Sequence, residues 1–243
     1  MIRRPSRRVR LLLYGVVPLV VLGGMVAMYY SGVGWLRRIV SPEASWIPAE
    51  TRSEYGLLES LQNLLLAALV VVAAVGLRRK RLPWERLAVW VLLVGALFML
   101  GEETDYGRHY LDLLGMGDGA ARGVAGPFNL HRIGYLQAVL RNAAKFGVLT
   151  FFGCFAIVFA QSPRPLPRYL APDRFAVLTV LLITALVELA WKLGDRAVLP
   201  IGSLDGHEEE FAELGTYYLA LLYSVDMLFW RRYFPRKRTA PEE

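Results

Sequence analysis

The 243-residue chain is 55% hydrophobic and has a mean hydropathy of +0.38, well above the values of ordinary soluble proteins. Its net charge of +7 comes mainly from arginine placed between long apolar runs. The single cysteine, Cys154, excludes an internal disulfide and a thiolate metal cluster. These features predict an all-α, polytopic transmembrane helical bundle.

A spanning helix needs about 20 mostly apolar residues, because lipid offers no hydrogen-bond partner to the backbone. In chain order, six segments predict spans at about 11–30, 55–77, 87–104, 138–161, 174–193 and 209–230. The first run is too long for a cleaved signal peptide and is expected to remain as a helix. We expect a single transmembrane domain over residues 1–243, with a glycine-rich outer loop at 104–136.

Arginine and lysine indicate the orientation, because they are retained on the cytoplasmic side of short loops. With the N-terminus inside, the inner segments hold 18 of the 28 basic residues, at 3–10, 78–86, 164–174 and 231–238. We therefore expect a multi-pass protein of a bacterial-type inner membrane with both termini in the cytoplasm. The basic runs are expected to contact anionic lipids, not nucleic acid.

Acidic residues gather at the outer ends of the predicted spans, namely Glu59, Glu102, Glu103, Glu210 and Glu213. An ionised carboxylate facing lipid costs roughly 3 kcal/mol or more, so such acids usually face the bundle interior. The pairs Glu59/Gln62 and Glu210/Glu213 are i,i+3 neighbours on one helix face. We expect an inward-facing cluster. For Glu208 and Glu209 a simpler interpretation is a solvated position at a helix N-terminus, where the dipole favours negative charge.

A motif surrounds two of these acids. Residues 101–107 read G-E-E-T-D-Y-G, and Asn129-Leu130-His131 follows a glycine-rich stretch. This pattern resembles a family of uncharacterised bacterial multi-pass membrane proteins with the motif G-E-E-x-S-W-G-Q, then N-L-H, and helix-starting E-x-x-Q and E-x-x-E elements. The matching helix-starting elements here are Glu59/Gln62 and Glu210/Glu213. The chain departs from the motif at Asp105, Tyr106 and Arg108. The resemblance implies a polar site but no settled activity.

Several glutamates and one histidine on convergent helices are the ligand types of Zn²⁺, Mn²⁺ and iron. Such a divalent metal would activate water for hydrolysis, and without a metal neighbouring acids would serve as general acid and base. The spacing matches neither H-E-x-x-H nor E-x-x-H. The candidate catalytic residues are Glu102, Glu103 and His131. The candidate substrate-binding residues are Gln62, Asn129 and Arg132. The candidate metal ligands are Glu59, Glu103, His131, Glu210 and Glu213.

The leading hypothesis is a membrane hydrolase or transferase, with or without a metal, that acts on a lipid or lipid-linked substrate. Membrane lipids are the expected partners. A structural or assembly subunit of a membrane complex and an ion-coupled transporter are the alternatives. The sequence has neither a matching inner acidic site nor an inverted repeat, which disfavours the transporter.

Overall fold

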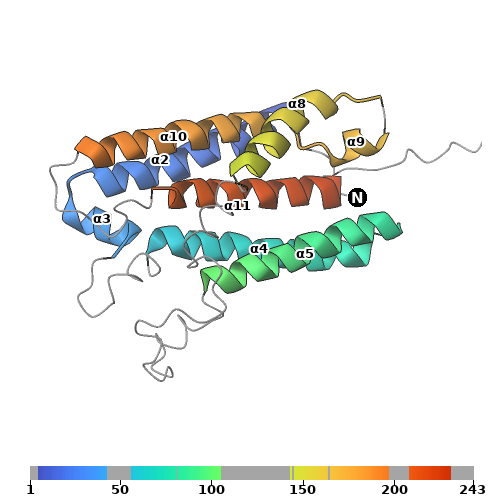
Figure 1. Ribbon diagram of the computed structural model, residues 1–243, viewed down its shortest axis with the longest axis horizontal. Coiled ribbons are helices and arrows are strands. Elements are labelled where there is room, and N and C mark those ends of the chain that lie inside the picture. The colour runs from blue at the N-terminus through green and yellow to red at the C-terminus, as the bar shows by residue number, and fades with distance from the viewer. Residues whose placement is uncertain are drawn as a thin grey trace, which may run out of the picture.

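The computed structural model describes residues 5–42, 56–80, 82–104, 143, 145–163, 165–196 and 208–230, which form helices and turns without a strand (Figure 1). The helices are α1 (Arg7–Leu11), α2 (Val17–Tyr30), α3 (Gly34–Val40), α4 (Leu57–Arg79), α5 (Pro83–Glu103), α8 (Ala156–Phe159), α9 (Pro165–Leu170), α10 (Ala176–Arg196) and α11 (Glu210–Val225). Three wider, π-helical stretches continue some of them: η1 (Leu12–Val16), η5 (Leu149–Phe155) and η6 (Asp226–Trp230).

Three of the described helices are long and apolar enough to cross a membrane: Arg7–Tyr30, Leu57–Arg79 and Ala176–Gly194. The helix Lys145–Phe159 is apolar but shorter. Large apolar side chains remain exposed along these helices and along α5, for example Leu64, Val91 and Leu181, each more than 60% exposed. A surface of this kind suits lipid better than water. For the described residues, the prediction of an all-α chain with helices of membrane-spanning length is confirmed.

Helix α11 lies between two helix pairs, α2 with α10 on one side and α4 with α5 on the other (Figure 1). At Gly215, an added Cβ would lie 2.5 Å from Ile183 Cγ1 of α10 and 3.2 Å from Leu22 Cδ1 of α2. Helix association in membranes depends on van der Waals packing, so small residues at contacts bring backbones together. Gly215 thus fits α11 into the centre of the bundle.

Two elements were not among the predicted spans. Helix α3 lies between the first two predicted spans, and α9 lies in the predicted inner segment 164–174. Both are too short to produce a spanning pattern, so neither was predicted. The predicted outer loop beyond Thr104 and the start of the fourth span, at 138–142, lie outside the described residues.

The first helix of spanning length, Arg7–Tyr30, contains the wide stretch η1 because of Pro18. Proline has no N–H, so it cannot donate to the carbonyl of Tyr14 four residues earlier. Val17 N–H donates to Leu12 O instead of Leu13 O. Neighbouring helices supply the missing donors. The Thr179 hydroxyl of α10 donates to Tyr14 O at 2.5 Å, and the Tyr218 hydroxyl of α11 donates to Leu13 O at 2.7 Å.

Thr179→Val is therefore expected to lower the free energy of unfolding in detergent by about 1 kcal/mol, because the buried Tyr14 carbonyl loses its donor. In a Pro18→Ala background the same substitution should cost less, since residue 18 then has an N–H of its own. Thermal or denaturant unfolding of the two single variants and the double variant measures this coupling. Strictly additive effects of the two substitutions on the free energy of unfolding would contradict this explanation of the Thr179 hydrogen bond.

The beginning of the same helix is fixed by an ion pair to Asp173, three residues before α10 begins. Arg10 Nη1 lies 2.8 Å from Asp173 Oδ2. The second oxygen, Asp173 Oδ1, accepts a hydrogen bond from Phe175 N at 3.1 Å and so helps to begin α10. Asp173 is buried, and its charge is compensated on both oxygens.

Candidate functional site

Predicted acids from three helices meet at one end of the bundle. Glu59 lies in the first turn of α4, Glu103 in the last turn of α5, and Glu210 and Glu213 in the first turn of α11. Helix α5 runs antiparallel to α4 and α11, so the C-terminus of α5 lies beside the other two N-termini (Figure 1). Glu59 is buried, and the other three carboxylates are partly buried.

Tyr217 of α11 lies at the centre of this group. Its hydroxyl donates a hydrogen bond to Glu103 Oε1 at 2.5 Å. Glu59 and Glu213 lie within electrostatic range of the same hydroxyl. We call Glu59, Gln62, Glu103, Glu210, Glu213 and Tyr217 the carboxylate cluster. Tyr217 was not among the predicted site residues, although it follows Glu213 by four residues and so shares its helix face.

Gln62 connects α4 to α11. Its side chain is fully buried, and Nε2 donates to the backbone oxygen of Glu210 at 3.0 Å. The other amide atom, Oε1, is buried and has no hydrogen-bond partner among the described residues. Gln62 was predicted to bind substrate, and the structure gives it a contact between helices together with one unsatisfied acceptor.

Glu208 corrects one expectation. A solvated position was expected, but Glu208 is only 4% exposed and accepts a hydrogen bond from the Tyr30 hydroxyl at 3.1 Å. Gly194 of α10 makes room, because a Cβ at that position would lie 2.8 Å from Glu208 Oε1. Glu209 is buried as well. Packing of α2 and α10 against the start of α11 therefore outweighs the preference of a first-turn acid for water.

The remaining candidates divide into two groups. Glu102 is partly buried beside Glu103. His131, Asn129 and Arg132 lie outside the described residues, so their roles stay predictions. Within the described part of the chain, no three His, Cys, Asp or Glu residues are arranged to hold a metal ion. The predicted ligand set as a whole stays a prediction, because His131 lies outside the described residues.

No family model, curated protein or solved structure matches this chain. The family resemblance therefore stays a prediction that rests on the motif at 101–107 and on Asn129-Leu130-His131.

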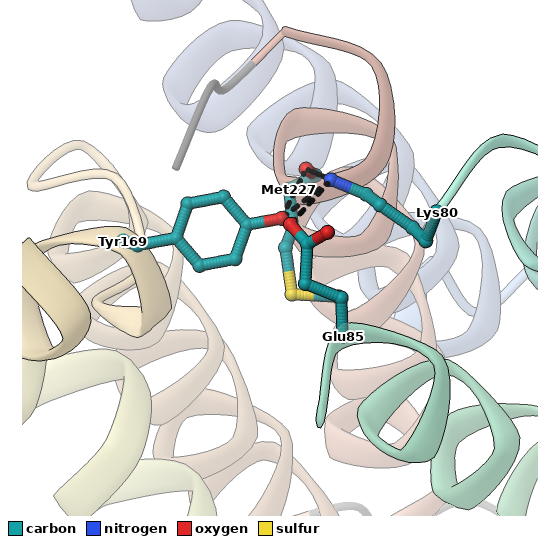
Figure 2. A network of polar contacts seen from close by, with 4 residues as sticks. All are labelled: Lys80, Glu85, Tyr169 and Met227. Carbon is teal, nitrogen blue, oxygen red and sulfur yellow. Dashed lines mark hydrogen bonds and ion pairs between the residues drawn. The ribbon is translucent and has the colours of Figure 1, made fainter. Parts of the chain in front are cut away.

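A second polar group lies at the opposite end of the bundle, and Figure 2 shows it. Lys80, directly after α4, donates to the Tyr169 hydroxyl at 2.5 Å, to Met227 O at 3.3 Å and to Glu85 Oε1 at 3.4 Å. Tyr169 also donates to Met227 O at 3.3 Å. This lysine network joins the ends of α4 and α5 to α9 and η6.

Burial lowers the pKa of Lys80 below its ordinary value of 10.5, and the Glu85 carboxylate opposes this shift only in part. Desolvation of the ammonium thus exceeds its attraction to Glu85. The Nζ atom also lies 5.1 Å from the centroid of the Tyr169 ring. Because the hydroxyl that Nζ contacts lies in the ring plane, we interpret this distance as a result of the hydrogen bond and not as a cation–π contact.

Proposed function

We propose that the chain is a multi-pass protein of the bacterial inner membrane with six spans and both termini in the cytoplasm. The three helices of spanning length support a membrane location. The carboxylate cluster and the lysine network lie at opposite ends of α4 and α11, and the basic segments of the sequence adjoin the lysine end. This separation of charge agrees with a cytoplasmic lysine end and an outer carboxylate end.

Reporter fusions test this orientation. Fusions after Arg81 and after Arg238 are expected to give cytoplasmic signals, and a fusion near Gly119 a periplasmic one, because lysine and arginine oppose translocation of short loops. Alkaline phosphatase and green fluorescent protein fused at the same three positions serve as opposite readouts. A cytoplasmic signal at Gly119 would overturn the orientation.

The proposed activity is that of a membrane-embedded hydrolase or transferase acting on a lipid or lipid-linked substrate at the outer leaflet. The observation that carries it is the hydrogen bond between Tyr217 and Glu103, with Glu213 and Glu59 in electrostatic range. Carboxyl groups that interact electrostatically with one another divide readily into proton donor and proton acceptor. Partial exposure of Glu103 and Glu213 leaves the cluster within reach of a head group at the membrane surface.

In such a reaction one carboxylate removes the proton of the attacking water or hydroxyl group, and a protonated neighbour gives a proton to the leaving group. The Tyr217 hydroxyl orients Glu103. A metal would require ligands beyond the described carboxylates, with His131 as the predicted source, and no step is assigned to one.

A structural or assembly subunit is the second candidate, because the bonds of Gln62 and Tyr217 also hold α4, α5 and α11 together. Lipid turnover distinguishes the enzyme from the structural subunit. Purified protein in vesicles of total bacterial lipid extract is expected to change the lipid composition over time, as followed by mass spectrometry, whereas Glu103→Gln protein should not. Unchanged lipids with the parent protein, together with readily unfolding glutamine variants, would favour the structural role.

A further inference from the structure

Helix α3 lies at the same end of the bundle as the carboxylate cluster, between the end of α2 and the start of α4 (Figure 1). It follows almost directly on Arg7–Tyr30, the first helix of membrane-spanning length. A segment in that position lies at the boundary between membrane and water, because the helix before it already has the length of the hydrocarbon core. Helix α3 is therefore placed at the level of lipid head groups.

Both ends of α3 are held by the structure. The turn before it contains Gly32, whose φ of 75° is in the left-handed region. The hydroxyl of Ser31 accepts a hydrogen bond from Val33 N at 3.1 Å, directly before the helix begins. At the other end, a Cβ at Gly56 would overlap the backbone oxygen of Val40, so the start of α4 packs closely on the last residue of α3. These contacts determine which face of α3 points away from the bundle.

The outward face of α3 combines two apolar side chains with a basic one. Trp35 is 64% exposed and Ile39 is 42% exposed. Arg38 is exposed as well, and the three residues are i,i+3 and i,i+4 neighbours on one helix face. Val40, in contrast, is fully buried. A helix with exposed tryptophan and arginine together is typical of the membrane interface, where the ring and the cation both find suitable surroundings.

The charge of this segment favours an anionic partner. Residues 31–42 contain Arg37 and Arg38 and no acidic residue. A guanidinium matches the shape of a phosphate group and can donate two parallel hydrogen bonds to it. In the proposed orientation both arginines lie on the outer side, where short loops usually contain few basic residues. A phosphate partner would explain why they are present there.

We propose that the outward face of α3 binds anionic phospholipids. Trp35 and Ile39 lie among the upper parts of the acyl chains, and Arg38 contacts the phosphate group, with its aliphatic stem along the apolar surface. This inference rests on the membrane location given under the proposed function, and it adds the class of lipid that one surface of the protein selects.

Two other occupants fit this face less well. In a symmetric dimer formed through α3, the arginines of the two copies would approach one another, and like charges repel. A zwitterionic phospholipid has an ammonium group of its own, which compensates the phosphate charge and weakens the attraction to Arg38. An anionic phospholipid has no such group, so it offers apolar chains and an uncompensated phosphate together.

Fluorescence quenching by brominated lipids tests the proposal on the full-length protein in vesicles. The signal of Trp35 is the difference between the parent protein and Trp35→Phe, and that of Trp90 comes from Trp90→Phe in the same way. Trp90 is 50% exposed on α5 and serves as the control for contact with lipid of any class. Trp35 is expected to be quenched about twofold more by bromine near the head group than by bromine near the chain ends.

The class of lipid is tested by placing the bromine on one lipid only. In equal mixtures of phosphatidylglycerol and phosphatidylcholine, quenching of Trp35 is expected to show about fivefold enrichment of phosphatidylglycerol next to α3. Arg38→Gln, a change at an exposed position, should shift this enrichment toward equality. Arg8→Gln is the matched control, because Arg8 is exposed in α1, at the other end of Arg7–Tyr30. It should leave the enrichment at Trp35 unchanged.

The results distinguish this inference from the membrane location on which it rests. Quenching of Trp90 without quenching of Trp35 would overturn the inference alone and would show that protein, not lipid, covers α3. Equal quenching of Trp35 by the two brominated lipids, or an unchanged enrichment in Arg38→Gln, would overturn the selection of anionic lipid. Absence of quenching at both tryptophans would contradict the membrane location as well.

Discussion

Glu103→Gln is expected to reduce lipid turnover at least about a hundredfold, because a glutamine can neither accept nor give the proton that general acid–base catalysis requires. The same variant should be as stable as the parent protein or more stable. Glutamine still offers Tyr217 an oxygen to accept its hydrogen bond, and loss of one charge relieves repulsion among the neighbouring carboxylates. Glu102→Gln and Glu213→Gln are expected to follow the same pattern.

Turnover and thermal unfolding in detergent, measured on the same preparations, decide between function and structure. Glu188→Gln is a matched control, since Glu188 is exposed on α10, a helix that contributes no residue to the cluster. It should retain both activity and stability. A purely structural cluster would show the opposite result for Glu103→Gln, Glu102→Gln and Glu213→Gln, which would then all unfold at lower temperature.

Lys80→Met is expected to lower the free energy of unfolding by about 2 kcal/mol. The loss has two sources. Glu85 loses the ammonium that pairs with it in a buried position, and Met227 O loses one of its two side-chain donors among the described residues. The position of Glu85 in the first turn of α5 moderates the cost, because a helix N-terminus favours a carboxylate.

The double variant Lys80→Met/Glu85→Leu separates charge from packing. Since desolvation of Lys80 exceeds its attraction to Glu85, replacing both groups by apolar ones should recover most of the stability. A double variant less stable than Lys80→Met alone would show that the ion pair itself stabilises the fold.

The pH dependence provides a further readout of the same variant. The pKa of Lys80 is lowered in the folded protein, so unfolding takes up a proton at pH values between the folded pKa and 10.5. This group therefore makes the folded state more stable as the pH rises through that interval. Below it, where Lys80 is charged in both states, the full cost of the lowered pKa is present. The free energy of unfolding of the parent protein minus that of Lys80→Met should therefore increase as the pH rises through this interval.

The sequence predicted best those features that depend on the residues of a single helix. Apolar runs indicated the three helices that are long and apolar enough to cross a membrane, and the i,i+3 spacing of Glu59 and Gln62 placed both on the buried face of α4. Glu208 was misjudged because its environment comes from Tyr30 and Gly194, which are distant in sequence. A first-turn acid gives no sign of which neighbours will cover it.

The lysine network was beyond prediction for the same reason. Only Lys80 and Glu85 are close in sequence, whereas Tyr169 and Met227 come from other segments. Tyr217 was missed because a tyrosine in an apolar helix usually indicates packing. Its distance of four residues from Glu213 was the available signal. Polar contacts between helices depend on rotation and register, which hydropathy does not encode.

The wide stretch η1 also sets the rotational phase of the beginning of the chain. A π-helical turn contains one residue more than an α-helical turn, which rotates the preceding side chains by about 100° around the axis. Arg10 precedes this stretch and is directed at Asp173, while Leu22 after it is directed at the apolar core. Loss of a single residue here would leave the helix continuous but turn Arg10 toward a different neighbour. The length of this segment is therefore constrained as well as its composition.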